Sequence, residues 1–579
     1  MNTKAKLTIA AMAISIFLCM LDTTVMNIAL PAIQSGLNIS LENLSWAINV
    51  YTIVFAVFTI PLGRIADIFG RNKVYVLGLV LFGLGSLFSG FSNSAELLVA
   101  GRGIQSLGAA VIFPTSMTIG ISMTNMANRR NVIAALGITQ GLSSALGPTI
   151  GGIVTQYMGW RWIFFVNVPL ILIDLVLCLA LLQFKNENRS NSKIDWLGML
   201  LSMGALLSIT LALVKGNDWG WTSSSTIGLI IAFVFFFVLF ILAERKVKDP
   251  MVRLDLFKNR QFDGAALGIV MTGVLLVAIM VIMPSFFTKV LDKSELMAAL
   301  MITPTSVMIF IWAPIAGSVL EKIGPRLLIF IGMLLMACGY SSFLWIDPTQ
   351  YMQILIALLF VGAGFGMIAG PVMILGAADF TGEMLTASQS VMGVLRQIGT
   401  VLAVAIFVSA LSANISSAKS TALNDADYYI QKMDVSQQVK DSMRKKTHEQ
   451  FKNSGDADSV QTKQSSSFVS KKQRQQIIEE TYQKVMSKEP KNLPIQVKQV
   501  IYTRVTVQVD KKIKDTNSKV TNVVSKIKSN TKNLIVEAFI RPYKITFPFT
   551  VLAMLIALLF EEKRSYLKVK QQQLKQDIK

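Results

Sequence analysis

Long apolar stretches recur from one end of the chain to the other. About twenty apolar residues in a helix are enough to cross the hydrocarbon core of a bilayer. Each stretch is apolar on all sides rather than on one face, which favours helices in lipid. The pattern therefore predicts an all-α integral membrane protein with fourteen spans, at 7–30, 46–66, 74–92, 95–117, 132–154, 163–183, 194–214, 225–243, 264–287, 296–320, 326–345, 351–375, 387–411 and 543–560.

Composition narrows the function classes. The formal net charge is +21, but no basic stretch is interleaved with aromatic residues, so we expect no nucleic-acid partner. The one histidine, His448, falls in a polar region, which excludes a histidine-based metal centre or a Ser-His-Asp triad within the membrane. No Walker-type phosphate loop occurs, so ATP does not drive the protein directly. We expect no enzyme, no metal and no cofactor.

Lysine and arginine mark the loops that stay in the cytoplasm. They follow the even-numbered spans, and the alternate short loops are poorer in them. The rule predicts a multi-pass protein of the cell membrane with both termini cytoplasmic. The residues that carry this argument are Arg64, Arg71, Lys73, Arg129, Arg130, Lys185, Arg189, Lys193, Arg245, Lys246, Lys248, Arg253, Lys258, Arg260, Lys322, Arg326, Lys563, Arg564, Lys568 and Lys570.

The segment 412–542 breaks the apolar pattern. It is rich in Lys, Gln, Ser and Asn, and the span count places it outside the cell as a partly helical loop domain. Helical spacing of apolar residues occurs at Val520, Val523, Val524 and Ile527, and again at Ile477, Ile478 and Val485. An extracellular hairpin without chemistry and a role in gating or partner binding both remain open.

Two short motifs repeat at equivalent loops. Gly63, Asp67, Gly70 and Arg71 end the second span, and Gly317, Glu321, Gly324 and Arg326 end the tenth with the same spacing of glycine, acid and glycine. Repeated halves around a central site are typical of secondary transporters. We predict a six-helix half at 1–184, two inserted helices with linkers at 185–260, five helices of the second half at 261–411, the loop domain at 412–542, a last span at 543–560 and a basic tail at 561–579.

The first span contains a carboxylate. Asp22 lies within the apolar run with Asn27 close behind. A charge inside the membrane costs several kcal/mol, so it usually faces the bundle interior and serves function. The alternative is a structural aspartate that caps a break in the helix.

The stretch from Leu21 to Pro31, LDTTVMNIALP, resembles the first-helix signature of the fourteen-span drug:proton antiporter family of the major facilitator superfamily. The resemblance covers nearly all of the membrane part but not 412–542. It implies the major facilitator fold, two six-helix halves plus two inserted helices. For Asp22 it implies an acid that binds a proton or contacts a cation.

Further motifs carry the resemblance. Gly63 to Lys73 resembles a loop whose family role is a conformational latch. Arg102 and Gln105 resemble the fourth-helix motif, although Ser106 stands where the family prefers glycine. An arginine within a span needs a partner, and Asp22 is the candidate; a structural salt bridge without coupling is the alternative. Gly141, Gly147, Pro148, Gly151 and Gly152 resemble the antiporter motif, which in the family distinguishes exporters from importers.

Asp174 lies within the sixth span and is a candidate second acid or a structural partner. Together these features predict proton-coupled efflux of lipophilic, cationic drugs by alternating access, with a proton reaching Asp22 and weakening its pairing with Arg102. The expected partners are small substrates, protons and membrane lipids, and the expected state is a monomer. Three rival functions remain: export or flipping of an endogenous lipid or glycolipid, metabolite export, and a non-transporting scaffold or sensor.

Overall fold

The protein is described here from a computed structural model that covers residues 3–38, 41–124, 126–185, 187, 189–190, 193–453, 471–490, 494–563 and 566. Within these ranges the chain forms helices joined by short turns, and it contains no β-strand. The helices group into two compact units. The first comprises Met1–Ser409 and Pro542–Lys579, and the second Ala410–Arg541.

The first unit begins with the helices of the predicted first half. Its elements are α1 (Thr3–Leu37), α2 (Leu41–Phe69), α3 (Arg71–Gly90), α4 (Ala95–Ser122), α5 (Met126–Met158), α6 (Trp162–Phe165) and α7 (Asn167–Leu181). The two inserted helices, α8 (Trp196–Trp219) and α9 (Ser224–Glu244), are followed by a short 3-10 helix, η1 (Leu254–Lys258).

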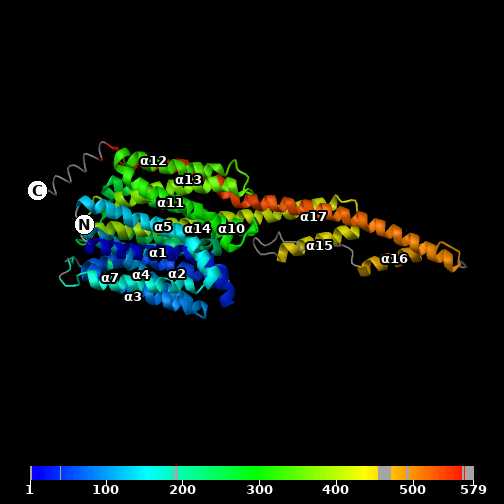
Figure 1. Ribbon diagram of the computed structural model, residues 1–579, viewed down its shortest axis with the longest axis horizontal. Helices are drawn as coiled ribbons and strands as arrows, with labels where there is room; N and C mark the ends of the chain where they lie inside the picture. Colours follow the sequence, from blue (N-terminus) through cyan, green and yellow to red (C-terminus); the bar gives the residue numbers. More distant parts are fainter. Residues whose placement is uncertain are drawn as a thin grey trace. The chain divides into compact units, whose positions relative to one another are not determined.

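The second half follows in the same unit. Its elements are α10 (Arg260–Lys289), α11 (Glu295–Ile323), α12 (Pro325–Ser342), α13 (Tyr351–Ala377), the first part of α14 (Gly382–Gln431), the end of α17 (Ile495–Ala553) and η2 (Met554–Leu559). Figure 1 shows the helices of the first unit running alongside one another.

Thirteen helical segments of the described residues are long and apolar enough to cross a membrane. They correspond to thirteen of the fourteen predicted spans. The remaining span, 132–154, lies within α5, a 33-residue helix that packs against α1, α11 and α13. The protein is therefore a multi-pass membrane protein with an all-α fold.

Small residues bring equivalent helix pairs together in the two halves. A Cβ atom at Gly108 of α4 would collide with the backbone of α3 at Phe82. In the second half, a Cβ atom at Gly364 of α13 would collide with α12 at Gly332 and Met336. Close backbone approach at glycine is how helices associate in lipid, where hydrophobic burial gives no net driving force. Both halves use it at the same place.

The repeated motifs form the same turn. Gly70 joins α2 to α3 with φ 112°, and Gly324 joins α11 to α12 with φ 91°. Both angles lie in a region that residues with a Cβ rarely adopt, which explains why glycine ends each motif. The internal repeat seen in the sequence therefore corresponds to a repeated backbone conformation.

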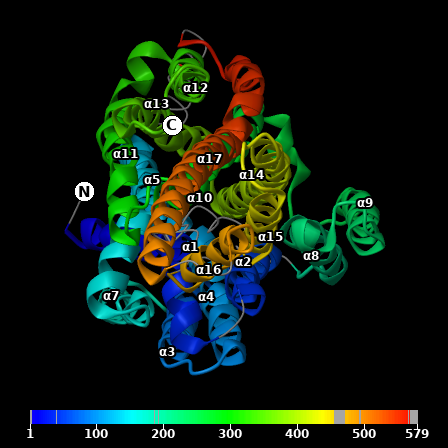
Figure 2. The same cartoon turned by 90° about the vertical axis from the view of Figure 1, so that its right-hand side faces the viewer.

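The inserted helices lie at the side of the two halves. α8 packs against α2, and α9 packs mainly against α8 (Figure 2). Most of the α9 side chains are exposed, among them Phe235 and Val238. An apolar helix with so little protein contact is suited to contact lipid.

The second unit contains the remaining part of α14, α15 (Gln437–Asn453), α16 (Lys471–Met486) and most of α17. One of its cores joins Ile478 of α16 to Val505 and Val509 of α17, and Arg474 forms two 2.7 Å bonds to Asp510 beside it. Its bounds are close to the predicted segment 412–542, but 454–470 and 491–493 lie outside the described residues, as does most of the predicted tail 561–579. Its extracellular location stays a prediction.

Apolar residues of α17 also form a second small core in this unit. Val520, Val523 and Ile527 pack with residues of α14 and α15, whereas Val524 and Ile477 of the predicted apolar faces are largely exposed. The helical spacing thus located two buried faces. On each face one residue that was expected to be buried, Val524 or Ile477, is exposed.

Candidate functional site

A buried polar cluster surrounds Asp22 of α1. Its carboxylate forms an ion pair with Arg102 of α4 and accepts a 2.9 Å hydrogen bond from Gln105 Nε2. Asn167 of α7 approaches the same carboxylate at 3.4 Å. Asp22 is 5% exposed and Arg102 1% exposed, so the charges compensate each other away from solvent. The pairing expected from the sequence is present in the structure.

Arg102 contacts several neighbours besides Asp22. Its Nη1 donates to Gln105 Oε1 at 2.7 Å, and its Nε donates to the Ala47 carbonyl of α2 at 3.3 Å. The guanidinium carbon lies 4.2 Å from the centre of the Tyr51 ring. Arginine has five donors in a planar fork, and these contacts use that geometry on two sides. The cluster therefore ties α1, α2 and α4 together.

Ser106 replaces the expected glycine without loosening this packing. Its hydroxyl is buried and donates to the Tyr51 carbonyl of α2 at 2.6 Å. A hydrogen-bonded serine between helices adds a polar link where glycine would add only close approach.

Asp174 of α7 lies in a separate buried cluster. Its carboxylate accepts hydrogen bonds from Ser15 of α1, from Tyr75 of α3 at 3.1 Å and from the Cys178 thiol at 3.4 Å. Tyr75 and Ser15 are also bonded to each other at 2.7 Å. The two predicted acids are thus not brought together. Ser15 and Asp22 are separated by about 10 Å along α1.

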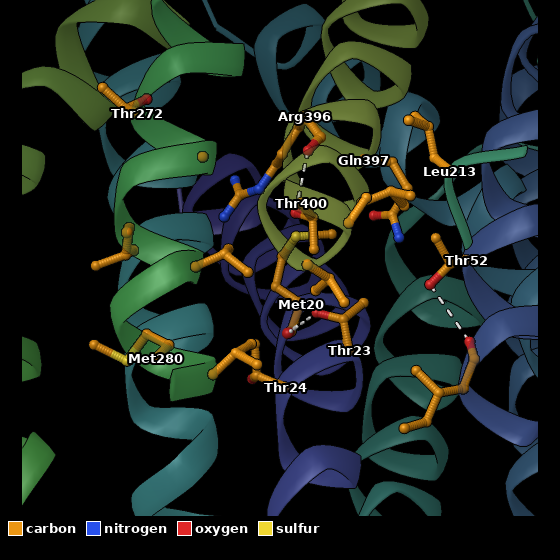
Figure 3. A pocket seen from close by; sticks show the side chains of 18 of the residues that line it. Met20, Thr23, Thr24, Thr52, Leu213, Thr272, Met280, Arg396, Gln397 and Thr400 are labelled. Carbon is orange, nitrogen blue, oxygen red and sulfur yellow. Dashed lines mark hydrogen bonds between the residues drawn. The ribbon is translucent and has the colours of Figure 1, made fainter. Parts of the chain in front are cut away.

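A cavity of about 410 Å³ lies between the two halves. Residues of α1, α2, α5, α8, α10, α13 and α14 line it, and most of them are apolar. Figure 3 shows its polar side chains, Thr23, Thr52, Thr272, Arg396 and Thr400 among them. Its size and apolar lining fit a drug-sized lipophilic molecule.

The cavity lining bears on the role expected of Asp22. The family resemblance implies that this acid binds a proton or contacts a cation. Asp22 does not line the cavity, although its neighbours Thr23 and Thr24 do. The lining contains one acid, Asp218, which pairs with Lys215 at 2.9 Å, and one aromatic residue, Phe365. The reason is helical geometry, because successive residues of α1 face different neighbours.

The α2–α3 turn contacts the beginning of α14 across the two halves. Asp67 accepts a 2.6 Å bond from Arg71 and a 2.9 Å bond from the Thr386 hydroxyl. Asp67 therefore contacts the first turns of α14 through a side chain. A Cβ atom at Gly63 would come within 2.5 Å of Ser390 Oγ.

Arg64 makes the ion pair that crosses this contact. Its Nη1 lies 2.8 Å from Glu383 Oε2 of α14. We assigned Arg64 only to membrane orientation, although an arginine inside the motif beside two glycines was a usable signal. From Thr386 to Arg396, where the cavity begins, is about 15 Å along α14. The two halves are therefore in contact at the α2–α3 end, and the cavity lies between them further along α14.

A family model described as the Major Facilitator Superfamily matches residues 12–404. The chain belongs to the Major Facilitator Superfamily.

Curated relatives of this superfamily member include proteins named for drug resistance, export or transport. It is 29% identical to the multidrug resistance protein Stp of Mycobacterium tuberculosis over 72% of this chain and 78% of that protein. It is 30% identical to the tetracenomycin C resistance and export protein of Streptomyces glaucescens over 64% and 68%. The multidrug transporter MdtP of Bacillus subtilis is 28% identical over 71% and 76%. This similarity supports drug efflux.

Solved transporter structures confirm the fold. The proton:xylose symporter XylE matches with a TM-score of 0.50 at 17% identity, over 70% of this chain and 88% of that one. The human organic anion transporter MFSD10 matches with a TM-score of 0.50 at 15% identity, over 71% and 93%. The predicted major facilitator fold is confirmed, and the protein is a transporter rather than an enzyme.

The glycines of α5 place this helix of the transporter against both halves. A Cβ atom at Gly147 would overlap Thr24 of α1, and one at Gly151 would lie 3.1 Å from Val25. Gly152 faces Ala299 of α11. Gly141 faces Phe365 and Ala369 of α13, and Pro148 lines the cavity. The motif therefore lies where the two halves meet beside the cavity.

The second copy of the loop motif, Gly317 to Arg326, contacts the segment after η2 rather than α14. Arg326 pairs with Glu562 at 2.5 Å and donates from Nε to the Phe560 carbonyl at 3.0 Å. A Cβ atom at Gly324 would lie 2.8 Å from Lys563. A Cβ atom at Gly317 would lie 3.7 Å from the Cβ atom of Ala134 in α5. Glu321 lies on the same helix as Gly317, α11. The side chain of Asn27 lies outside the described residues.

Replacing Arg64 by glutamine should open the α2–α3 end of the transporter. Removing one half-buried charge pair costs about 1 kcal/mol, which shifts a two-state population roughly fivefold. In a protein without its native cysteines, a cysteine at the buried position Ser388 should react faster with maleimide after Arg64→Gln. Lys258→Gln removes an exposed ion pair and is the control. Equal labelling rates in all three proteins would exclude the proposed latch.

Proposed function

We propose that this transporter exports lipophilic, cationic drugs from the cell in exchange for protons. The observation that carries the proposal is a largely apolar cavity between two halves, with ionised and ionisable side chains buried in the first half beside it. Drug-exporting relatives support the substrate class. A proton gradient supplies the energy, and no cofactor takes part.

A cationic drug would place its apolar body against α10 and α13 and its charge near Asp218. Arg396 also lines the cavity, and its positive charge would repel the cation. Lys215 competes for the same carboxylate, so binding of the drug requires this pair to separate.

Protons would be carried by a buried carboxyl of the first half, Asp22 or Asp174. Both side chains are buried, and both lie on helices that pack against one another, α1 and α7. Acids within spans commonly relay protons in transporters.

Alternating access would use the contact between the α2–α3 turn and α14 as its latch. By the positive-inside rule, that end is cytoplasmic, since Arg64, Arg71 and Lys73 lie there. The structure then represents a state closed to the cytoplasm. The same rule places both termini in the cytoplasm and the unit Ala410–Arg541 outside.

A second candidate is a lipid flippase or exporter, and Arg396 favours it. Its guanidinium donates to Gln140 at 2.9 Å and lines the cavity, where it would suit an anionic headgroup. The apolar lining would accept acyl chains equally well.

Purified protein in liposomes with an acidic lumen decides between them. Liposomes that hold the transporter with its cytoplasmic face outward should accumulate ethidium in the lumen. The expected concentration ratio is up to about tenfold per pH unit for each proton exchanged. Protein-free liposomes and liposomes at equal pH are the controls. Flipping of labelled phosphatidylglycerol without any ethidium accumulation would support the flippase instead. The absence of both activities would contradict both proposals.

A further inference from the structure

We infer that Asp174 is the carboxyl that binds and releases the transported proton, whereas Asp22 serves in the buried ion pair with Arg102. The inference rests on the proposed drug:proton exchange and assigns its proton to one residue. It follows from the different hydrogen-bond partners of the two buried acids.

Asp22 is a poor proton carrier because of Arg102. A guanidinium has five donors and no acceptor, and it does not lose its proton in proteins. Protonation of Asp22 would leave the Arg102 charge buried at 1% exposure without its counter-charge. Breaking a buried pair in this way is strongly unfavourable.

Asp174 has partners that suit both protonation states. Ser15 and Tyr75 are hydroxyls, which donate to a carboxylate and accept from a carboxylic acid. The third partner, the Cys178 thiol, is also neutral. Among the described residues Asp174 forms no ion pair, and its side chain is fully buried. Proton uptake there leaves no charge uncompensated.

The titratable groups around Asp174 come from three helices. Tyr75 faces it from α3, and Cys178 from the next turn of α7. Cys19 is buried on α1, one turn beyond Ser15 and one turn before Asp22. The neighbouring acid, Asp22, already has its counter-charge in Arg102. Among the described residues, the side chains that bond Asp174 are therefore all neutral.

Asp174 is also linked to the proposed latch. Tyr75 follows Arg71 by one turn of α3, about 6 Å. Asn72, in the first turn of α3, donates to the Gln183 carbonyl beyond α7 at 2.8 Å, and its backbone N–H donates to Glu187 at 3.0 Å. The helices that hold Asp174 thus also hold the α2–α3 turn, so opening of that turn would bring water towards Tyr75.

In the proposed step one O–H bond breaks and another forms. A hydronium ion in one access state gives its proton to an oxygen of Asp174 and is left as water, and the carboxylate becomes a carboxylic acid. The Ser15 hydroxyl turns from donor to acceptor. In the other access state the proton returns to water on the opposite side of the membrane.

The test compares Asp174→Asn, Asp22→Asn and the exposed control Asp347→Asn in liposomes. Asp174→Asn should keep ethidium exchange at equal pH while its pH-driven accumulation falls from up to about tenfold per proton to none. Asp347→Asn should match wild type. One component of the infrared carboxylic-acid absorption that changes with pH should be present in wild type and Asp22→Asn and absent in Asp174→Asn.

Accumulation retained in Asp174→Asn, or a carboxylic-acid band lost only in Asp22→Asn, would overturn the inference. If Asp174→Asn does not fold, Tyr75→Phe decides, since loss of one hydroxyl partner should move the pH midpoint of exchange. An unchanged midpoint would also overturn it. Wild type that never accumulates ethidium would instead contradict the proposed function itself.

Discussion

Arg102→Met is expected to destabilise the protein by about 3–5 kcal/mol, because it leaves the Asp22 carboxylate buried without its partner. The substitution also removes the bonds to Gln105 and to the Ala47 carbonyl. Thermal unfolding in detergent, followed by the reactivity of the buried native cysteines, measures the effect. Transport should fall with the folded fraction.

The double variant Asp22→Asn with Arg102→Met is the matched control. It removes both charges, and asparagine can still accept the bond from Gln105 Nε2. Replacing a buried pair by neutral residues is often close to neutral in stability, so most of the lost stability should return. A double variant as unstable as Arg102→Met alone would show that the pair is not the source of the effect.

Gly147→Val should abolish transport while the protein still inserts and folds. A Cβ atom at Gly147 would overlap Thr24, so α5 and α1 must separate. Overpacking costs about 1–3 kcal/mol, enough to lower the population of a closely packed state by a factor of about 5 to 160. Ethidium efflux from cells, at matched expression, measures the result.

Gly228→Val is the control for this substitution. Gly228 lies in α9, and a Cβ atom there would meet nothing within 4 Å. The two variants add the same side chain to a membrane helix, one at the contact of α5 with α1 and one in open space on α9. Normal efflux in Gly147→Val would exclude a role of this close contact in transport.

Together these variants would separate two tasks of the first half. The Asp22–Arg102 cluster joins α1, α2 and α4 and is expected to act through stability. The α1–α5 contact lies beside the cavity and is expected to act through motion.

The sequence by itself determined the class of the protein. Apolar runs long enough to span a bilayer predict helices, because only internally bonded backbone is stable in lipid. The repeated spacing of Gly63, Asp67 and Gly70 with Gly317, Glu321 and Gly324 predicted two related halves. The positive φ of Gly70 and Gly324 supplies the physical reason for the repeat.

Sequence reasoning also selected the pair of Asp22 and Arg102, since each lies within a span and needs a partner. Their opposite charges and similar depth were sufficient for that prediction. The chemical reason is the cost of an unpaired charge in a low-dielectric medium.

Only the tertiary structure decided which side chains face the cavity and which acid has a counter-charge. Thr23 and Asp22 are adjacent in sequence, yet one lines the cavity and the other is buried behind it. Asp174 finds hydroxyls from α1 and α3, and Arg64 finds Glu383 of α14 across the two halves. These pairings depend on the rotation and packing of each helix, which a uniformly apolar span does not encode in its pattern.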